Sequence, residues 1–348
     1  MKIILTGGGT AGHVNPNLAL IPYLQAEDFE IEYIGSIDGM EKDLVKQKKI
    51  PYHGISSGKL RRYFDIKNFT DIGNVFKGIL QSKNLMKKLK PNIIFSKGGF
   101  VTVPVVFAGW LHRIPVVIHE SDITMGLANK ISSIFASVVC TSFSQTAKHM
   151  KKAIVTGPPI RSELFNASAR RAKKILNFND NPVILIMGGS QGSIKINETV
   201  IQILDKLSNF NIIHICGKGN SQNIKRKNYI QYEYVTDKLA DFFALADIIV
   251  SRSGSNSIFE FLALRKPNLL IPLPKKSSRG DQILNAKLFE KEGFSKVLPE
   301  EKLNAESLFE NIITLISERD IYIKNMEKFN FENGSLKIID QIKKYARN

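Results

Sequence analysis

The chain has 348 residues, 43% of them hydrophobic and 23% charged, so it is long enough for two domains with separate cores and too apolar to be disordered. Its formal net charge of +17 is compatible with nucleic acid, an anionic membrane surface, an acidic substrate or a merely lysine-rich composition. Nucleic acid is disfavoured, because the sequence has no zinc-finger spacing, aromatic ribonucleoprotein signature or long basic tail. It also has neither a signal-peptide pattern nor an apolar run near the ~20 residues that span a bilayer, so we expect a cytoplasmic protein.

The first predicted elements are an apolar strand at 2–5, a glycine-rich loop at 7–12 and a helix at 16–24. Such a loop leaves backbone N–H groups and the positive end of the helix dipole directed outward, which suits phosphate. His13 directly follows the loop, and a helix N-terminus favours the neutral imidazole that accepts a proton. Two interpretations stay open for this side chain: a general base, or a histidine that caps or packs the helix end.

The same loop satisfies the glycine fingerprint of dinucleotide-binding domains through Gly7, Gly9 and Gly12, so a nicotinamide-dependent enzyme is an alternative. That fingerprint also requires an acidic residue at the end of the second strand, to hold a ribose. The strand predicted at 31–34 is followed by Gly35 and Ser36, with no carboxylate. This weakens the alternative.

Short apolar runs alternate with helical segments through the rest of the chain, which predicts parallel sheets covered by helices on both faces. Further strands are expected at 93–95, 116–118, 138–141, 183–186, 212–216, 248–251 and 269–271. We predict an α/β architecture of two doubly wound domains, 1–161 and 162–331, with a hinge near the prolines of segment 157–159. A final helix within 332–348 has Leu336, Ile339, Ile342 and Tyr345 at helical spacing, and packing back on the first domain is one arrangement for it.

The strand, glycine loop and helix pattern occurs a second time, with the strand at 183–186, the loop at 188–193 and the helix at 196–207. Two copies suggest two similar domains facing a phosphorylated ligand. In doubly wound sheets, ligands bind beyond the carboxyl ends of the strands, so we expect the site in a cleft between the domains.

Polar groups follow other predicted strands. Gly98 and Gly99 form a third glycine turn, and segment 119–122 follows the strand at 116–118. Segment 251–257 precedes the helix that carries Glu260, whose carboxylate can accept two hydrogen bonds from a ribose diol. No Asp-x-Asp pair ends a strand, so no divalent metal is indicated, and Cys140 and Cys216 are interpreted as buried thiols.

In this order the motifs resemble the MurG family of bacterial glycosyltransferases almost from end to end. The resemblance is carried by segments 8–13, 98–101, 119–120, 157–161, 188–192 and 252–260. It implies a GT-B fold of two Rossmann-like domains, no cofactor, and a metal-independent, inverting transfer. In that reaction GlcNAc passes from UDP-GlcNAc to the MurNAc 4-hydroxyl of undecaprenyl-pyrophosphoryl-MurNAc-pentapeptide, which converts lipid I to lipid II in peptidoglycan synthesis.

The resemblance also implies roles for individual residues, with the donor held mainly by the second domain. The residues implied to bind UDP-GlcNAc are Thr10, Ala11, Gly12, Asp122, Arg161, Ser190, Asn197, Val235, Arg252, Ser255, Glu260 and Gln282. Those implied on the acceptor side are Gly9, Gly98, Gly99, His119 and Glu120, with His13 as the base. Within the donor set, Glu260 is implied to bind the ribose, the backbone near Val235 the uracil and Ser190 the phosphates.

Three positions depart from the family pattern. Ala11 stands where a glycine is usual, Asp122 where an asparagine is common, and Asp281 where a glutamine is common. The methyl group of Ala11 is tolerable where φ is negative. A carboxylate at 122 only accepts hydrogen bonds where an amide also donates them, which puts its sugar contact in question.

A lipid-linked acceptor requires the enzyme to reach a membrane. Apolar residues recur at near-helical spacing at Phe69, Ile72, Phe76, Ile79, Leu80 and Met86, and basic residues surround them at Arg61, Arg62, Lys67, Lys77, Lys83, Lys87, Lys88 and Lys90. The stripe is interpreted either as core or as a surface that docks on anionic inner-leaflet lipids, and we expect peripheral attachment at the cytoplasmic face of the membrane. The remaining alternatives are a diacylglycerol glycosyltransferase, a UDP-GlcNAc 2-epimerase and a nucleotide-binding sensor without catalysis.

Overall fold

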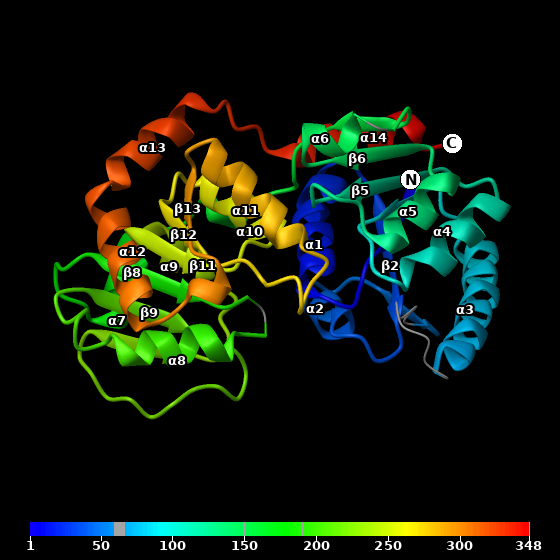
Figure 1. The fold of residues 1–348 in the computed structure, drawn as a ribbon. Helices are drawn as coiled ribbons and strands as arrows, with labels where there is room; N and C mark the ends of the chain where they lie inside the picture. Colours follow the sequence, from blue (N-terminus) through cyan, green and yellow to red (C-terminus); the bar gives the residue numbers. More distant parts are fainter. Residues whose placement is uncertain (59–66, 149, 190, 348) are drawn as a thin grey trace. The chain divides into compact units, whose positions relative to one another are not determined.

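The computed structural model describes residues 1–58, 67–148, 150–189 and 191–347, with the backbone only for 67–72. The chain forms two compact units, which are coloured along the sequence in Figure 1. Unit 1 comprises Met1–Arg161 and Glu332–Asn348, and unit 2 comprises Ser162–Phe331. Each unit contains one parallel sheet flanked by helices, so the predicted fold class is confirmed.

Unit 1 has a seven-stranded sheet in the order β3-β2-β1-β4-β5-β6-β7. Its strands are β1 (Lys2–Thr6), β2 (Glu30–Ser36), β3 (Tyr52–Ile55), β4 (Ile93–Ser96), β5 (Val116–Glu120), β6 (Val138–Thr141) and β7 (Ala153–Val155). From β1 the strand order runs outward through β2 to β3 on one side and from β4 to β7 on the other, so it reverses between β1 and β4. Loops that follow these two strands therefore lie at the switch point, where doubly wound sheets bind ligands.

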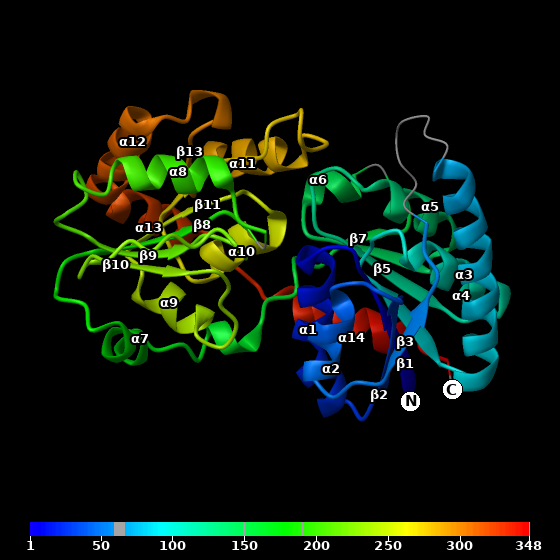
Figure 2. The same ribbon diagram turned by 90° about the horizontal axis from the view of Figure 1, so that it is seen from below.

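The helices of unit 1 cover both faces of this sheet, as Figure 2 shows. They are α1 (Ala11–Ala26), α2 (Glu41–Gln47), α3 (Lys67–Leu89), α4 (Thr102–Leu111), α5 (Leu127–Phe135), α6 (Ser144–Ala147) and α14 (Gly334–Tyr345). Helices α1, α2 and α14 share one core, and α3 and α4 contribute to the core on the opposite face. Helix α14 buries Ile338, Ile339 and Ile342, whereas Leu336 is exposed, so the apolar face predicted for it was wrong at Leu336.

Unit 2 has a six-stranded sheet in the order β10-β9-β8-β11-β12-β13, with its switch point between β8 and β11. The strands are β8 (Val183–Met187), β9 (Asn211–Ile215), β10 (Tyr229–Tyr232), β11 (Ile248–Ser251), β12 (Asn268–Leu270) and β13 (Ser295–Val297). The helical elements are η1 (Ser162–Leu164), α7 (Ala169–Leu176), α8 (Ile194–Gln202), α9 (Leu239–Leu245), α10 (Ser255–Ala263), α11 (Asp281–Lys291), η2 (Glu300–Lys302), α12 (Ala305–Ser317) and α13 (Arg319–Lys328). Helices α8 and α12 pack into one core on a single face of this sheet.

Both cysteines are buried free thiols, as predicted. Burial raises the pKa of Cys140 to about 12, which keeps the thiol protonated and unreactive.

Candidate active site

The loop that follows β8 leads into the N-terminus of α8 in unit 2. Gly189 and Gly192 have φ of 92° and 77°, a region that favours glycine. A Cβ at Gly192 would also collide with the carbonyl of Cys216. Ser193 caps α8, since its Oγ accepts a hydrogen bond from the N–H of Ile196 (3.4 Å). The helix N-terminus is therefore presented at the switch point, whereas Ser190, the predicted phosphate contact, lies outside the described residues.

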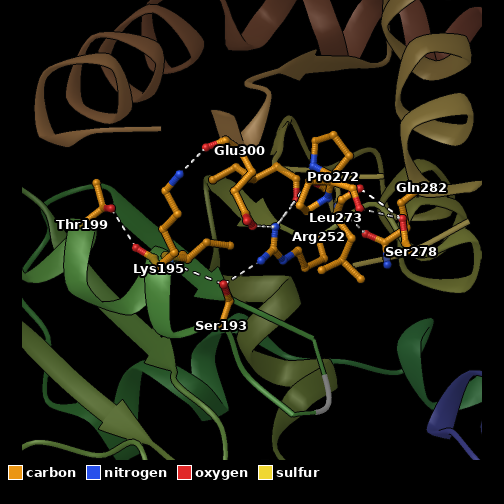
Figure 3. Close-up of polar contacts among 12 residues, drawn as sticks. Ser193, Lys195, Thr199, Arg252, Pro272, Leu273, Ser278, Gln282 and Glu300 are labelled. Carbon is orange, nitrogen blue, oxygen red and sulfur yellow. Dashed lines mark hydrogen bonds and ion pairs between the residues drawn. The ribbon is translucent and has the colours of Figure 1, made fainter. Parts of the chain in front are cut away.

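Arg252 follows β11 and ties this loop to two later segments (Figure 3). Its buried guanidinium donates to Ser193 Oγ (2.7 Å) and to the carbonyl of Ile271 (3.1 Å), and it forms an ion pair with Glu300. Lys195 Nζ donates to the carbonyl of Glu300 (2.6 Å), which adds a second tie. Arg252 was implied to line the donor site, and its contacts with Ser193, Ile271 and Glu300 connect the glycine loop to these later segments.

Gln282 connects the turn before α10 to α11. Its side-chain Oε1 accepts from the N–H of Leu273 (3.1 Å), and its carbonyl accepts from Ser253 Oγ (2.9 Å). Ser255, which is buried, begins α10, and the partly exposed Glu260 lies further along the same helix. In unit 2, Arg252, Glu260 and Gln282 thus come from the segments that follow β11 and β12, on the side of the switch point opposite to β8.

Asn197, on α8, forms hydrogen bonds inside unit 2 near the glycine loop that follows β8. Its Nδ2 donates to the carbonyl of Cys216 (2.8 Å), and its Oδ1 accepts from His214 Nε2 (3.0 Å). His214 Nδ1 in turn accepts from the hydroxyl of Tyr229 (2.8 Å), and burial lowers the pKa of His214 to about 4, so the ring is neutral. Asn197 was implied to contact UDP-GlcNAc, but its buried amide is engaged within unit 2. Val235 is partly buried in the loop after β10, and its role with uracil stays a prediction.

In unit 1 the loops after β1 and β4 contact each other at the switch point. The N–H of Gly8 donates to the carbonyl of Gly98 (3.2 Å), and the N–H of Gly9 donates to the carboxylate of Glu41 (3.2 Å). Gly98 and Gly99 have φ of 107° and 92°. These amides of the first glycine loop are thus used inside the unit. Phosphate binding by this loop stays a prediction, and Glu41 is a partner that the sequence did not reveal.

The residues after this loop begin α1. Thr10 is the exposed N-cap residue, and Gly12 is exposed in the first turn. Ala11 lies in the helix without a positive φ, which accounts for its methyl group where a glycine is usual. Arg161, another predicted donor contact, is the last residue of the first segment of unit 1 and is partly exposed.

His13 lies in the first turn of α1, and its ring orientation is set by the loop. Nδ1 is 3.1 Å from the carbonyl oxygen of Gly8 and 3.2 Å from Thr10 Oγ1. Because a carbonyl can only accept, the hydrogen bond to Gly8 places the proton on Nδ1. In the neutral ring Nε2 then carries the lone pair, which is the tautomer that a general base at this nitrogen requires.

Two residues predicted on the acceptor side point into unit 1. His119 is fully buried in β5, its Nε2 lies 3.1 Å from the carbonyl of Gly157, and burial holds its pKa well below the ordinary value. Glu120 accepts hydrogen bonds of 3.0 Å each from the N–H groups of Asp122 and Gly126 and from Nδ2 of Asn129. Glu120 therefore supports the segment after β5, whereas His119 contacts Gly157 in the segment after β7. Asp122 itself is partly exposed.

Lys97, between β4 and the Gly98 turn, is a residue that the sequence did not single out. Its ammonium is buried and donates to Ser121 Oγ. Burial lowers its pKa to about 8, while the nearby carboxylates of Glu120 and Asp122 act in the opposite direction. A lysine beside two glycines is ordinarily a surface residue, so only the structure reveals this cation at the switch point.

We expect Lys97→Met to stabilise unit 1 at pH 7, by up to about 3 kcal/mol, because a charged lysine is then no longer buried. The pKa of about 8 lies below the ordinary 10.5, so the unfolded chain binds more protons between these values. The stability of the parent chain therefore rises with pH in this window, and the advantage of the variant shrinks. Urea unfolding at pH 7 and pH 10 measures the difference in unfolding free energy between variant and parent, with Lys83→Met, at an exposed position, as the control. A difference that is constant with pH would contradict this cause.

Among the described residues, no group of three or more His, Cys, Asp or Glu side chains is arranged to hold a metal ion.

Comparisons with known proteins give the family. The N-terminal and C-terminal domains of glycosyltransferase family 28 match residues 3–141 and 183–342. A relative from Clostridium tetani, described as UDP-N-acetylglucosamine–N-acetylmuramyl-(pentapeptide) pyrophosphoryl-undecaprenol N-acetylglucosamine transferase, is 54% identical over 99% of this chain and 98% of its own length.

Solved structures agree in fold. The crystal structure of Acinetobacter baumannii MurG has a TM-score of 0.74 at 25% identity and covers 99% of both chains. A UDP-GlcNAc 2-epimerase from Neisseria meningitidis has a TM-score of 0.69 at 16% identity, over 99% of this chain and 100% of that one, which shows the fold alone. With the identity to the Clostridium tetani relative spanning the chain, the protein belongs to the MurG family of N-acetylglucosaminyltransferases within glycosyltransferase family 28.

Proposed function

We propose that this protein transfers GlcNAc from UDP-GlcNAc to the MurNAc 4-hydroxyl of undecaprenyl-pyrophosphoryl-MurNAc-pentapeptide, forming lipid II for peptidoglycan. The observation that carries the proposal is the 54% identity, over nearly the full length of both chains, to a transferase described by that donor and acceptor. The epimerase and the diacylglycerol transferase remain as outcomes of the test, since a shared fold does not decide between reactions.

The donor is assigned to unit 2. Three features support this assignment. The N-terminus of α8 lies at the switch point, Arg252 donates a hydrogen bond to Ser193, which caps α8, and Glu260 lies on α10. A helix N-terminus and a nearby guanidinium favour the negative charge that develops on UDP as it leaves. In the same proposal Glu260 binds the ribose hydroxyls and the backbone near Val235 reads the uracil.

The chemical step is a single in-line displacement. Nε2 of a neutral His13 takes the proton from the MurNAc 4-hydroxyl as its oxygen attacks the anomeric carbon. The bond from that carbon to the UDP oxygen breaks on the opposite face, so an α-linked donor yields a β-linked product. The tautomer set by the carbonyl of Gly8 supports this role.

The test incubates the protein with radiolabelled UDP-GlcNAc and either a MurNAc-pyrophosphoryl lipid or diacylglycerol, and then identifies the product. Transfer to the MurNAc lipid alone is the expected result. A labelled glycolipid from diacylglycerol, a free epimer, or bound nucleotide without a product would each replace the proposal with the corresponding alternative.

Attachment to the membrane is assigned to the α3 and α4 side of unit 1. Phe76 and Leu80 on α3 are 65% and 63% exposed, Trp110 on α4 is also exposed, and lysines 77, 83, 87 and 88 are exposed on α3. Met86 of the predicted stripe is 2% exposed and belongs to the core, so it is not part of this surface. Of the other residues predicted here, positions 61 and 62 and the side chains of 67, 69 and 72 lie outside the described part. None of the described helices has the length and apolar character needed to cross a bilayer.

We expect the protein to sediment with anionic vesicles, and the bound fraction to fall with salt, since each well-placed cation contributes about 1 kcal/mol. Phe76→Glu with Leu80→Glu should abolish this binding. Ile321→Glu, at an exposed apolar position of unit 2, is the control. Binding that is absent, or insensitive to salt, would count against this surface.

A further inference from the structure

Glu41 is a fully buried carboxylate that the proposed chemistry does not use. It is the first residue of α2 and is 0% exposed. Its Oε2 accepts from the N–H of Gly9 (3.2 Å), and its Oε1 accepts from the N–H (2.9 Å) and the hydroxyl of Ser36. Backbone amides and a hydroxyl thus satisfy this carboxylate at the end of β2, beside the first glycine loop.

The surrounding glycines make room for this side chain. A Cβ at Gly8, Gly35 or Gly39 would collide with atoms of Glu41. An internal carboxylate therefore explains Gly8 of the first loop and two glycines near the end of β2. In a dinucleotide-binding domain the acidic residue at the end of the second strand holds a ribose. In this protein the carboxylate is that of Glu41 on α2, and it accepts a hydrogen bond from Gly9 of the first glycine loop.

Glu41 and His13 bind opposite sides of one peptide group. The N–H of Gly9, which donates to Glu41, and the C=O of Gly8, which accepts from His13 Nδ1, belong to the same planar amide. Because the peptide group is planar, the hydrogen bond that fixes the Gly9 N–H also fixes the direction of the Gly8 C=O. A carboxylate on the N–H also polarises the amide and strengthens its carbonyl as an acceptor.

We propose that Glu41 is a positioning residue for His13, acting through the Gly8–Gly9 peptide to hold the imidazole in its Nδ1–H tautomer and in a fixed orientation. The step assigned to His13 rests on the proposed function, whereas the effect of Glu41 on the ring does not. Glu41 itself touches neither substrate nor the transferred proton.

The test compares Glu41→Gln with Asp43→Asn, which removes the same charge from an exposed position of α2. In Glu41→Gln the amide group cannot accept from both backbone N–H donors as a carboxylate does, so the Gly8–Gly9 peptide shifts. We expect kcat to fall by about 10²-fold, as for a ~1 Å displacement of a catalytic group. The KM for UDP-GlcNAc should match that of Asp43→Asn, whereas the melting temperature should fall by a few degrees, because a buried N–H loses its acceptor. Glu41→Asp, which keeps the charge, should recover part of kcat.

The second measurement is the ¹⁵N NMR signature of the His13 ring, which reports the tautomer without any turnover. Glu41→Gln should shift this signature away from Nδ1–H, and Asp43→Asn should not. A failure of the proposed function would leave this shift in place. An unchanged ring signature, or a kcat equal to that of Asp43→Asn, would overturn the proposal. So would a loss of donor affinity together with kcat, because that would indicate a general structural role.

Discussion

Replacing His13 with alanine lowers kcat for GlcNAc transfer by about 10²–10⁴-fold, the usual contribution of a general base. The ring has Nδ1 bound to the Gly8 carbonyl, and we propose that Nε2 accepts the proton of the acceptor hydroxyl. Alanine removes the base and retains the helix. The affinity for UDP-GlcNAc should stay within about twofold, since the donor is assigned to unit 2 and no shared hydrogen bond is lost.

The measurement is turnover at saturating donor and acceptor, with calorimetric binding of UDP-GlcNAc alongside. His53→Ala is the matched control, because this histidine of unit 1 pairs with Glu32 (2.7 Å) in the outer part of the sheet. It should retain nearly full turnover. Wild-type kcat in His13→Ala would remove His13 from the chemical step.

Replacing Arg252 with alanine destabilises unit 2 by about 3–5 kcal/mol, the range for breaking a buried ion pair on one side. The side chains of Arg252 and Glu300 are only 9% and 16% exposed. Alanine leaves the carboxylate of Glu300 without its cation and Ser193 Oγ without its donor, so the glycine loop loosens and UDP binding weakens as well.

Urea unfolding of the full chain measures this effect. Arg265→Ala is the control, because Arg265 pairs with Glu327 at 3.4 Å with side chains 59% and 48% exposed, and such pairs contribute about 1 kcal/mol at most. Replacing both Arg252 and Glu300 with methionine should restore much of the stability, since no unpaired charge is then buried. If Arg252→Ala and Arg265→Ala were equally stable, the ion pair would not hold the loop.

The strands that the sequence predicts are those in the interior of each sheet. The strands it misses, β3, β7, β10 and β13, are the four edge strands. Interior strands are buried on both faces and therefore appear as continuous apolar runs, such as Ile248–Ser251. Three of the edge strands carry polar residues, for instance His53 in β3 and Lys296 in β13, and the fourth, β7, is apolar but only three residues long, so no long apolar run marks any of them.

The candidate site also has parts that the sequence predicts and parts that only the structure shows. Local motifs locate the glycine loops, because a tight turn between a strand and a helix requires glycine wherever it is found. They do not locate Glu41 or Glu300, whose partners Gly9 and Arg252 lie 32 and 48 positions away in the chain. Nor do motifs give the direction of a side chain.

Asn197 and His119 show this limit. Both stand in segments that the family resemblance implies for binding, yet both side chains are buried and bonded within their own units. The first glycine loop is a related case, because Gly8 leaves the space that the Glu41 carboxylate occupies. The two similar loops therefore differ in what they hold: an internal carboxylate in unit 1, and, as we propose, the donor diphosphate in unit 2.

This division of roles is tested most directly by calorimetric titration of UDP-GlcNAc into the parent chain, Glu260→Ala and His13→Ala. Our account predicts that Glu260→Ala weakens binding by about tenfold or more, as expected for the loss of hydrogen bonds to a charged group, and that His13→Ala leaves it unchanged. Weaker binding in His13→Ala with unchanged binding in Glu260→Ala would contradict the assignment of the donor to unit 2.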